Sequence, residues 1–149
     1  MQIQRGLHLP ADVFYAFPAY PVSPVPPEAH EQSAAVIAVV SRAAAAFAAR
    51  GYEVFPDGIV GPWFLPVVAA ELASTRIPVE YVVLQIGRDE AVRRATSRVQ
   101  SGDEVVVRHM HAEFQYLREY ASHAFDTTDM SIDDTFAEFA RRRSTGVLD

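Results

Sequence analysis

The sequence predicts an α/β fold in which a parallel sheet is covered by crossover helices. Short β-type segments alternate with helical patterns along the chain, which is typical of such a sheet. Half of the 149 residues are hydrophobic, and this length is enough to bury one sizeable core but too short to argue for two. We therefore expect a single domain over residues 1–149.

The first half of the chain predicts two strands with a long helix between them. The first strand, residues 6–10, leads into a Pro-rich stretch, 17–27, that is expected to be a loop. A helix then runs from about residue 27 through the alanine-rich tract until Gly51 supplies its left-handed stop. The second strand, 52–55, ends in a turn, and a further helix is expected up to residue 76.

The second half predicts two more strands. Residues 79–86 form a β-branched apolar run of the kind that is buried on both faces of a sheet. Helices are expected over 89–100 and 103–122, followed by a short strand over 123–126. The last helix begins with a capping box of Ser131 and Asp134 and ends at the arginine cluster 141–143.

Composition narrows the classes of function. The net charge of −6 and the scattered basic residues argue against a nucleic-acid surface. The start shows no secretory signal and no apolar tract suits a membrane span, so we expect a cytoplasmic protein without a membrane partner. The sequence contains no cysteine, and its 13 basic residues are all arginine. Chemistry that requires a lysine or a thiolate within this sequence is therefore excluded.

Aspartates follow three of the predicted strands. They are Asp12, Asp57 and Asp126. Ligands of open parallel sheets bind beyond the carboxyl ends of the strands, so acids at these ends are candidates for a site. A single aspartate there is more often a turn or cap residue, and it is the group of three that favours a functional interpretation.

The segment 57–63, Asp-Gly-Ile-Val-Gly-Pro-Trp, is the most specific local motif. Gly58 and Gly61 allow close approach of the backbone, and Trp63 is placed to form the wall of an apolar pocket. The structural alternative is a tight strand-to-helix turn with Pro62 in the first helical turn and Trp63 in the core. Spacing alone favours neither interpretation over the other.

Six segments in order carry a resemblance to a known family. The order of these segments resembles P-loop small-molecule kinases, the group that includes chloramphenicol phosphotransferase-like, gluconate kinase-like and zeta-toxin-like proteins. The resemblance spans nearly the whole chain and implies a three-layer sandwich. Its segments are 8–14 (HLPADVF), 27–32 (PEAHEQ), 57–63 (DGIVGPW), 81–84 (YVVL), 88–98 and 125–128 (FDTT).

The resemblance implies an acceptor site in the first half of the chain. Asp12 falls where the family has the acid that orients or deprotonates the acceptor hydroxyl, although Val13 stands where related sequences often carry a second acid. Asp57 would contact the substrate, or magnesium through water. Gly58, Gly61 and Trp63 would line the acceptor pocket, and His30 would face it.

The resemblance also implies a nucleotide side. Arg94 and Arg98 lie one helical turn apart, where arginines would stabilise the transferring phosphoryl group, and Thr127 would lie near the adenine. Each arginine alone is better explained as a solvated surface residue. ATP and Mg²⁺ are implied by resemblance only, and the pair His109 and Glu113 lacks a third ligand, so no metal site is predicted from the residues themselves.

The phosphate-binding loop of such kinases is missing from the sequence. The pattern Gly-x-x-x-x-Gly-Lys-Ser/Thr does not occur, and the segments begin at the family's second strand, so we expect the first βα unit to be absent. ATP and Mg²⁺ are then not expected to bind tightly, and the chain is expected to be inactive as it stands. An ATP-dependent phosphotransferase-like domain for a small hydroxyl compound is the leading hypothesis.

Two alternatives remain open. One is a non-catalytic ligand-binding or protein-interaction module derived from such a kinase, and the less favoured one is an unrelated flavodoxin-like binding domain. Loss of a strand from inside the sheet would leave apolar edges exposed, which predicts a homo-oligomer or a marginally stable protein.

Overall fold

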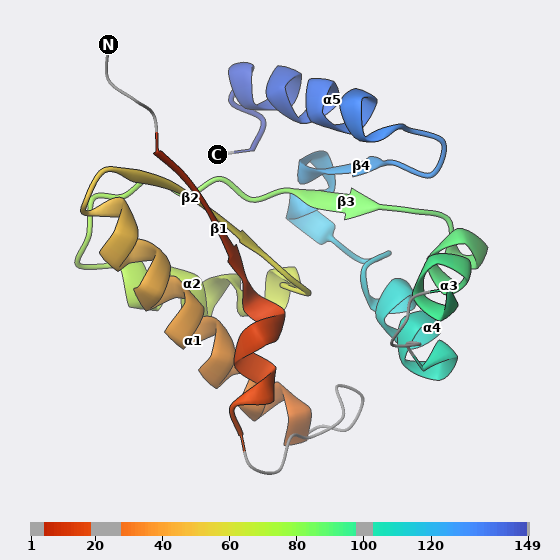
Figure 1. Ribbon diagram of the computed structural model, residues 1–149, viewed down its shortest axis with the longest axis horizontal. Coiled ribbons are helices and arrows are strands. Elements are labelled where there is room, and N and C mark those ends of the chain that lie inside the picture. The colour runs from red at the N-terminus through yellow and green to blue at the C-terminus, as the bar shows by residue number, and fades with distance from the viewer. Residues whose placement is uncertain (1–4, 19–27, 98–102, 149) are drawn as a thin grey trace. The chain divides into compact units, whose positions relative to one another are not determined.

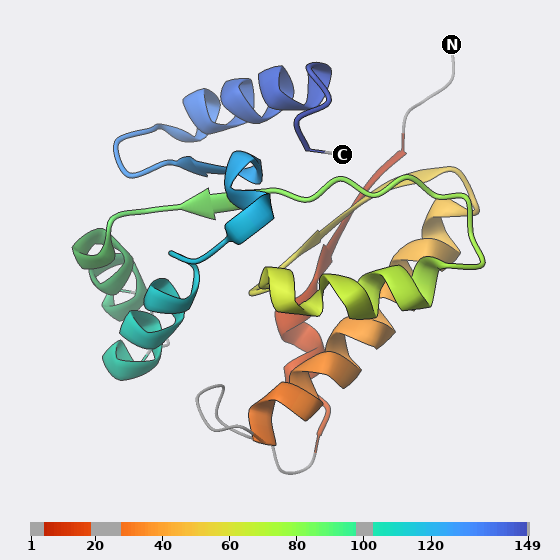
Figure 2. The same ribbon diagram turned by 180° about the vertical axis from the view of Figure 1, so that it is seen from behind.

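The computed structural model describes residues 5–18, 28–97 and 103–148. Contacts gather in two compact units, Met1–Ile77 and Pro78–Asp149. Each unit contains a parallel pair of strands whose connection includes helices (Figures 1 and 2). The expected mixture of helices and parallel strands is therefore confirmed at the level of an α/β class.

The first unit is built on the parallel pair β1 (Arg5–Pro10) and β2 (Tyr52–Asp57), in register from Arg5↔Tyr52 to Pro10↔Asp57. Leu9 on β1 packs against buried Ala11, Val36 and Val40, which form the core of this unit. The remaining elements are η1 (Ala11–Ala16) and α1 (Glu28–Ala48) between the strands, followed by η2 (Pro62–Phe64) and α2 (Leu65–Leu72).

Helix α1 matches the predicted long helix and ends before Gly51, whose φ of 83° is the left-handed conformation that glycine adopts readily. Its buried apolar residues are Ala29, Val36, Ile37 and Val40, which are spaced as on one face of a helix. An ion pair joins α1 to α2, with Arg42 Nε 2.5 Å from Glu71 Oε2. This ion pair therefore ties α2 to α1.

The second unit is built on β3 (Val83–Gln85) and β4 (Ala124–Asp126), paired in parallel from Val83↔Ala124 to Gln85↔Asp126. Val83, Leu117, Phe125 and Leu148 are its buried apolar side chains. The other elements of this unit are α3 (Arg88–Thr96), α4 (Glu104–Glu113), η3 (Arg118–His123) and α5 (Ile132–Ser144).

The start and end of α5 confirm the sequence prediction. The Ser131 side chain accepts a hydrogen bond from the Asp134 backbone N–H, and Asp134 in turn accepts from the backbone N–H of Ser131. The last turn of α5 contains the predicted arginine cluster 141–143. Both signals are local in sequence, which is why they could be recognised without the tertiary structure.

Two predictions in this unit are wrong. The strand expected over 79–86 is confined to β3, where Val83 is buried but Leu84 is 53% exposed, because only one face is packed. The helix expected over 103–122 ends at Glu113. Phe114 already leaves helical geometry with a ψ of 1°, and Arg118 has a φ of 52° that no right-handed helix accommodates.

The strand pairs that the structure describes do not by themselves establish the expected three-layer sandwich. Within the described residues, the four strands form two separate two-stranded sheets, β1–β2 and β3–β4.

Most of the predicted Pro-rich loop, 19–27, lies outside the described residues. Among the helices that are described, none combines the length and the apolar character needed to cross a bilayer.

Candidate functional site

The carboxyl end of the β1–β2 pair brings two of the predicted acids together. Pro10 and Asp57 are the last residues in register, and η1 begins directly after β1. The Asp12 carboxylate therefore lies beside the turn that follows Asp57, where Asp12 Oδ1 is 3.7 Å from the position that a Cβ atom would occupy on Gly58. Both acids are exposed and sit at the edge of the sheet where ligands bind in parallel folds.

Gly58 makes this close approach possible. A Cβ atom built on this residue would lie 2.8 Å from the Cβ of Ala11, closer than real Cβ atoms come to other side chains. Ala11 is itself buried in the core, so η1 cannot move away without disturbing the packing. The glycine predicted for backbone approach thus holds η1, and with it Asp12, against the end of β2.

His8 belongs to the same edge, although the sequence did not single it out. Its Nε2 atom lies 2.5 Å from Asp57 Oδ1, so the imidazole donates a hydrogen bond to the carboxylate. The two side chains are 67% and 65% exposed, and an ion pair this exposed contributes little to stability. The pair is recognisable only after the register of β1 and β2 is known, since 49 positions separate the two residues.

The other predicted residues of the first unit gather around Phe64. The His30 ring stacks on the Phe64 ring with their centroids 4.8 Å apart, and the Trp63 ring is tilted against Phe64 at 6.1 Å. Gly61 is buried beneath the Trp63 indole. His30 is exposed and Trp63 is half-buried, so both present part of a ring to solvent while Phe64 anchors them.

The predicted nucleotide-side residues of the second unit are engaged in internal hydrogen bonds. The Thr127 hydroxyl and backbone N–H both donate to the Gln85 carbonyl, at 3.0 and 2.7 Å, and Thr127 is buried. Arg94 Nε donates to Glu90 Oε1 at 2.6 Å. A ligand that used the Thr127 hydroxyl as a donor would have to replace the bond to β3. Arg98 lies outside the described residues.

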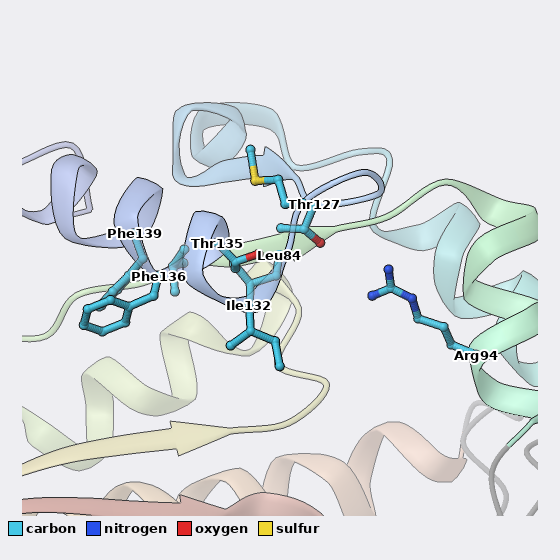
Figure 3. Close-up of a pocket in the computed structure, with 9 residues that line it drawn as sticks. Leu84, Arg94, Thr127, Ile132, Thr135, Phe136 and Phe139 are labelled. Atoms are coloured by element: carbon cyan, nitrogen blue, oxygen red, sulfur yellow. The ribbon is translucent and has the colours of Figure 1, made fainter.

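An apolar hollow of about 400 Å³ lies between β3 and α5 (Figure 3). Figure 3 shows Phe136 and Phe139 on α5 and Arg94 extending from the separate helix α3. Ile132 is 87% exposed and Phe136 is 68% exposed, so this hollow is open to solvent. It is lined by Val82, Leu84, Arg94, Thr127, Met130, Ile132, Thr135, Phe136 and Phe139.

A second hollow, of about 760 Å³, lies beyond the carboxyl end of β3. Thr128 closes the strand end there: its hydroxyl accepts from the Gly87 backbone N–H at 2.7 Å and donates to Asp126 Oδ1 at 2.5 Å. The hydrogen bonds from the Thr128 side chain and backbone lower the pKa of Asp126. The lining is polar: Gly87, Arg88, Asp89, Glu90, Arg108, His111, Ala112, Gln115 and Thr128.

Charges around this second hollow are largely satisfied within the protein. Hydrogen bonds from Arg93 and Arg94 lower the pKa of Glu90 to about 2. His111 Nε2 donates to the Ile86 carbonyl at 3.1 Å, which ties α4 to the end of β3. The third predicted acid, Asp126, is likewise committed to Thr128. The hollow therefore offers few free charged groups to a ligand.

The residues present do not fit an ATP triphosphate. A triphosphate is held by a glycine-rich loop at a helix N-terminus and by a lysine, and the sequence contains neither the loop pattern nor any lysine. Within the described part of the chain, no group of three or more histidine, aspartate or glutamate side chains is arranged to hold a metal ion. The polar chemistry that remains is acceptance and donation of hydrogen bonds by Asp12, Asp57 and His8.

No protein-family model matches the chain, and no curated protein is significantly similar to it in sequence.

Proposed function

We propose that these residues form a phosphotransferase-like domain that binds a small hydroxyl compound at the carboxyl end of the β1–β2 pair. The observation that supports this most is the parallel register that ends at Pro10↔Asp57 and places Asp12 beside Gly58. Carboxylates at this edge accept hydrogen bonds from hydroxyl groups. In this proposal Asp12 orients the acceptor hydroxyl, Asp57 contacts the compound, and the rings of Trp63 and His30 border the site.

Phosphoryl transfer by the 149 residues alone is not part of the proposal. The chain would need a triphosphate cradle that its own sequence does not contain, and it has no lysine to complete one. Arg94 and Thr127 would serve the nucleotide side only after giving up their bonds to Glu90 and Gln85. Cytoplasmic location and the absence of a nucleic-acid or membrane partner stay predictions of the sequence.

An ATP titration tests whether the nucleotide site of these residues is incomplete. Isothermal titration calorimetry with ATP and Mg²⁺ should show no binding at millimolar or tighter affinity. Tight binding would overturn the proposal that the nucleotide site is incomplete. If the gene also encodes a phosphate-binding loop upstream in frame, Asp12→Asn in that longer protein should lower turnover by about 10²–10⁴-fold and leave ATP affinity unchanged. Retained turnover would remove Asp12 from its role.

A second candidate function is a protein-interaction module. The observation that favours it is the apolar hollow between β3 and α5, where Leu84, Ile132 and Phe136 are 53%, 87% and 68% exposed. Exposed apolar groups that gather in one place mark interaction surfaces more often than isolated ones do. Binding of a hydroxyl compound at the Asp12 edge would favour the first function, and loss of self-association on changing the hollow would favour this one.

A further inference from the structure

The β1–β2 pair has one packed face and one open face. Side chains alternate along a strand, so Leu7 and Leu9 share the face that packs toward the α1 core, together with their partners Val54 and Pro56. The opposite face carries Gly6, His8 and Pro10 of β1 and their register partners Glu53, Phe55 and Asp57 of β2. We call these six residues the open face.

Phe55 forms an apolar platform on the open face. Its side chain is large and 42% of the residue is exposed, although it lies in the middle of a strand. A Cβ atom built on Gly6 would lie 4.0 Å from Cε2 of the Phe55 ring. The ring therefore extends toward β1 over a position without a side chain, and glycine at residue 6 adds no side chain beside the ring.

A polar pair lies next to this platform. His8 lies two residues after Gly6 on β1, and Asp57 lies two residues after Phe55 on β2. The 2.5 Å hydrogen bond from His8 Nε2 to Asp57 Oδ1 joins them. The other two polar atoms of these side chains, His8 Nδ1 and Asp57 Oδ2, make no hydrogen bond to the described residues. The pair thus leaves one imidazole nitrogen and one carboxylate oxygen able to accept hydrogen bonds from a ligand's hydroxyl groups.

We propose that the open face binds a ring-shaped polyhydroxyl compound, such as a pyranose or a cyclitol, with the ring against Phe55 and adjacent hydroxyls donating to His8 Nδ1 and Asp57 Oδ2. This deepens the proposed function, on which it rests, by naming the class of hydroxyl compound. Such a ligand has an apolar C–H face and a polar rim, and the open face offers an aromatic surface beside two acceptors.

Other occupants fit the open face less well. An anion would meet the carboxylate of Asp57, whose charge repels it. No group of three or more histidine or acidic side chains among the described residues could hold a metal ion, which argues against a cation centred on His8 and Asp57. A purely apolar surface of a partner would leave the His8–Asp57 pair desolvated without new hydrogen bonds. A neutral ligand with hydroxyl groups avoids all three penalties.

A titration followed by ¹H–¹⁵N NMR tests the proposal with the full chain. Methyl β-D-glucopyranoside and myo-inositol are the probes, and a dissociation constant on the order of millimolar is expected because so small a ligand has few atoms to contribute. Shifts should concentrate in residues 5–10 and 52–58. If neither probe shifts these residues at tens of millimolar, on the order of ten times the expected constant, the proposal is overturned.

Matched variants show whether the open face is responsible. Phe55→Leu keeps an apolar side chain but removes the ring, and His8→Ala removes one acceptor; each should weaken binding at least about tenfold, as loss of one buried ring or hydrogen bond does. Phe47→Leu is the control, because Phe47 is similarly exposed at 39% but its ring packs against Tyr52 from α1. Equal affinities for all three variants would overturn the proposal.

The result of this titration can be distinguished from a failure of the proposed phosphotransferase-like function. The titration contains no phosphoryl donor, so saturable binding on the open face would support the ligand class even if no phosphotransferase activity is ever found. Conversely, a longer protein that phosphorylates an open-chain alcohol, with a KM unaffected by Phe55→Leu, would uphold the function and overturn the ring ligand. NMR shifts of the same residues that depend on dilution but not on the probes would show that a second copy of the chain occupies the open face. That result would also overturn the ring-ligand proposal.

Discussion

Glu138 illustrates how single residues organise the second unit. Its carboxylate accepts from Arg141 and Arg142, each at 2.7 Å, and these hydrogen bonds lower the pKa of Glu138 to about 2. Arg142 also donates to the carbonyls of Ser122 and Ala124, and its guanidinium lies 4.9 Å from the centre of the Phe125 ring. Glu138 therefore orients the arginine that joins α5 to the start of β4.

This arrangement predicts acid sensitivity. The pKa of Glu138 is lower in the folded chain than its ordinary value of 4.5, so the ionised group stabilises the fold above about pH 4.5. That contribution should fall as pH decreases from 4.5 toward 2. Urea denaturation at pH values across this window should show a smaller decrease for Glu138→Gln than for the unchanged chain. Asp133→Asn, at an exposed acid of the same helix, is the control.

An equal pH dependence in Glu138→Gln and the unchanged chain would contradict the prediction. Salt gives a second check, because partly exposed ion pairs are screened at high ionic strength. The difference between the two proteins should shrink when the measurement is repeated in 1 M NaCl.

For single residues, an interaction is predictable from the sequence when its two partners lie close together along the chain. The Ser131–Asp134 capping box lies within four residues and was identified correctly. The His8–Asp57 pair depends on the register of two strands 49 residues apart, and nothing near either residue reveals it. The positions of Asp12 and Asp57 were accessible because parallel strands end at a common edge, but their chemical roles remain predictions.

At the scale of elements, the end of α4 shows where periodicity misleads. The apolar spacing of residues 103–122 continues across the break, and no glycine or proline marks it. The structure ends α4 at Glu113 and starts η3 at Arg118, whose φ of 52° is left-handed. Within the break, Leu117 is buried while its neighbours Tyr116 and Arg118 are exposed.

Glycine should therefore be tolerated at position 118 but not within α4. A left-handed residue other than glycine costs about 1–2 kcal/mol, and glycine costs roughly 0.5–1 kcal/mol in lost chain entropy, so Arg118→Gly should be neutral or raise the free energy of unfolding by up to about 1 kcal/mol. Arg108→Gly, the same substitution inside α4, should lower it by about 1 kcal/mol. Chemical denaturation measures both. A clear loss of stability in Arg118→Gly would show that the turn is not as described.

The strand pairs show the same limit at a longer range. Residues 52–57 and 124–126 were close to their predicted bounds, and for 52–57 the aromatic residues between Gly51 and Gly58 indicate a strand locally. The extent of β3 was overestimated, since an apolar run does not specify how many of its residues find a partner. Residues without a partner strand, such as Val79, remain outside the sheet and 46% exposed.

At the scale of the whole molecule, the α/β class was predictable and the joining of the strands into one sheet was not. Alternation of strands and helices fixes the class, whereas strand order depends on contacts that no single segment encodes. Within the described residues each strand pairs with one other strand only. Each two-stranded sheet therefore has two edges that no further strand of the described residues covers, and such edges can pair with another chain.

Open edges and exposed apolar side chains together predict self-association. Leu84 on β3 is 53% exposed, and the neighbouring hollow exposes Ile132 and Phe136 on α5. Burying such groups against a second copy gains roughly 25 cal/mol for each Å² of apolar surface removed from water. We expect the sedimentation coefficient of the chain to rise with concentration. The double variant Ile132→Glu, Phe136→Glu should sediment as a monomer, because charges in the hollow oppose its burial.

A matched control separates this surface from general solubility. Val105→Glu introduces one glutamate, the residue used at both positions of the double variant, at a residue of α4 that is 71% exposed and does not line the hollow, and it should leave association unchanged. Circular dichroism of all variants checks that the substitutions leave the helices intact. A chain that remains monomeric at every concentration and melts cooperatively would contradict the prediction, because the two open sheets would then be stable without a partner.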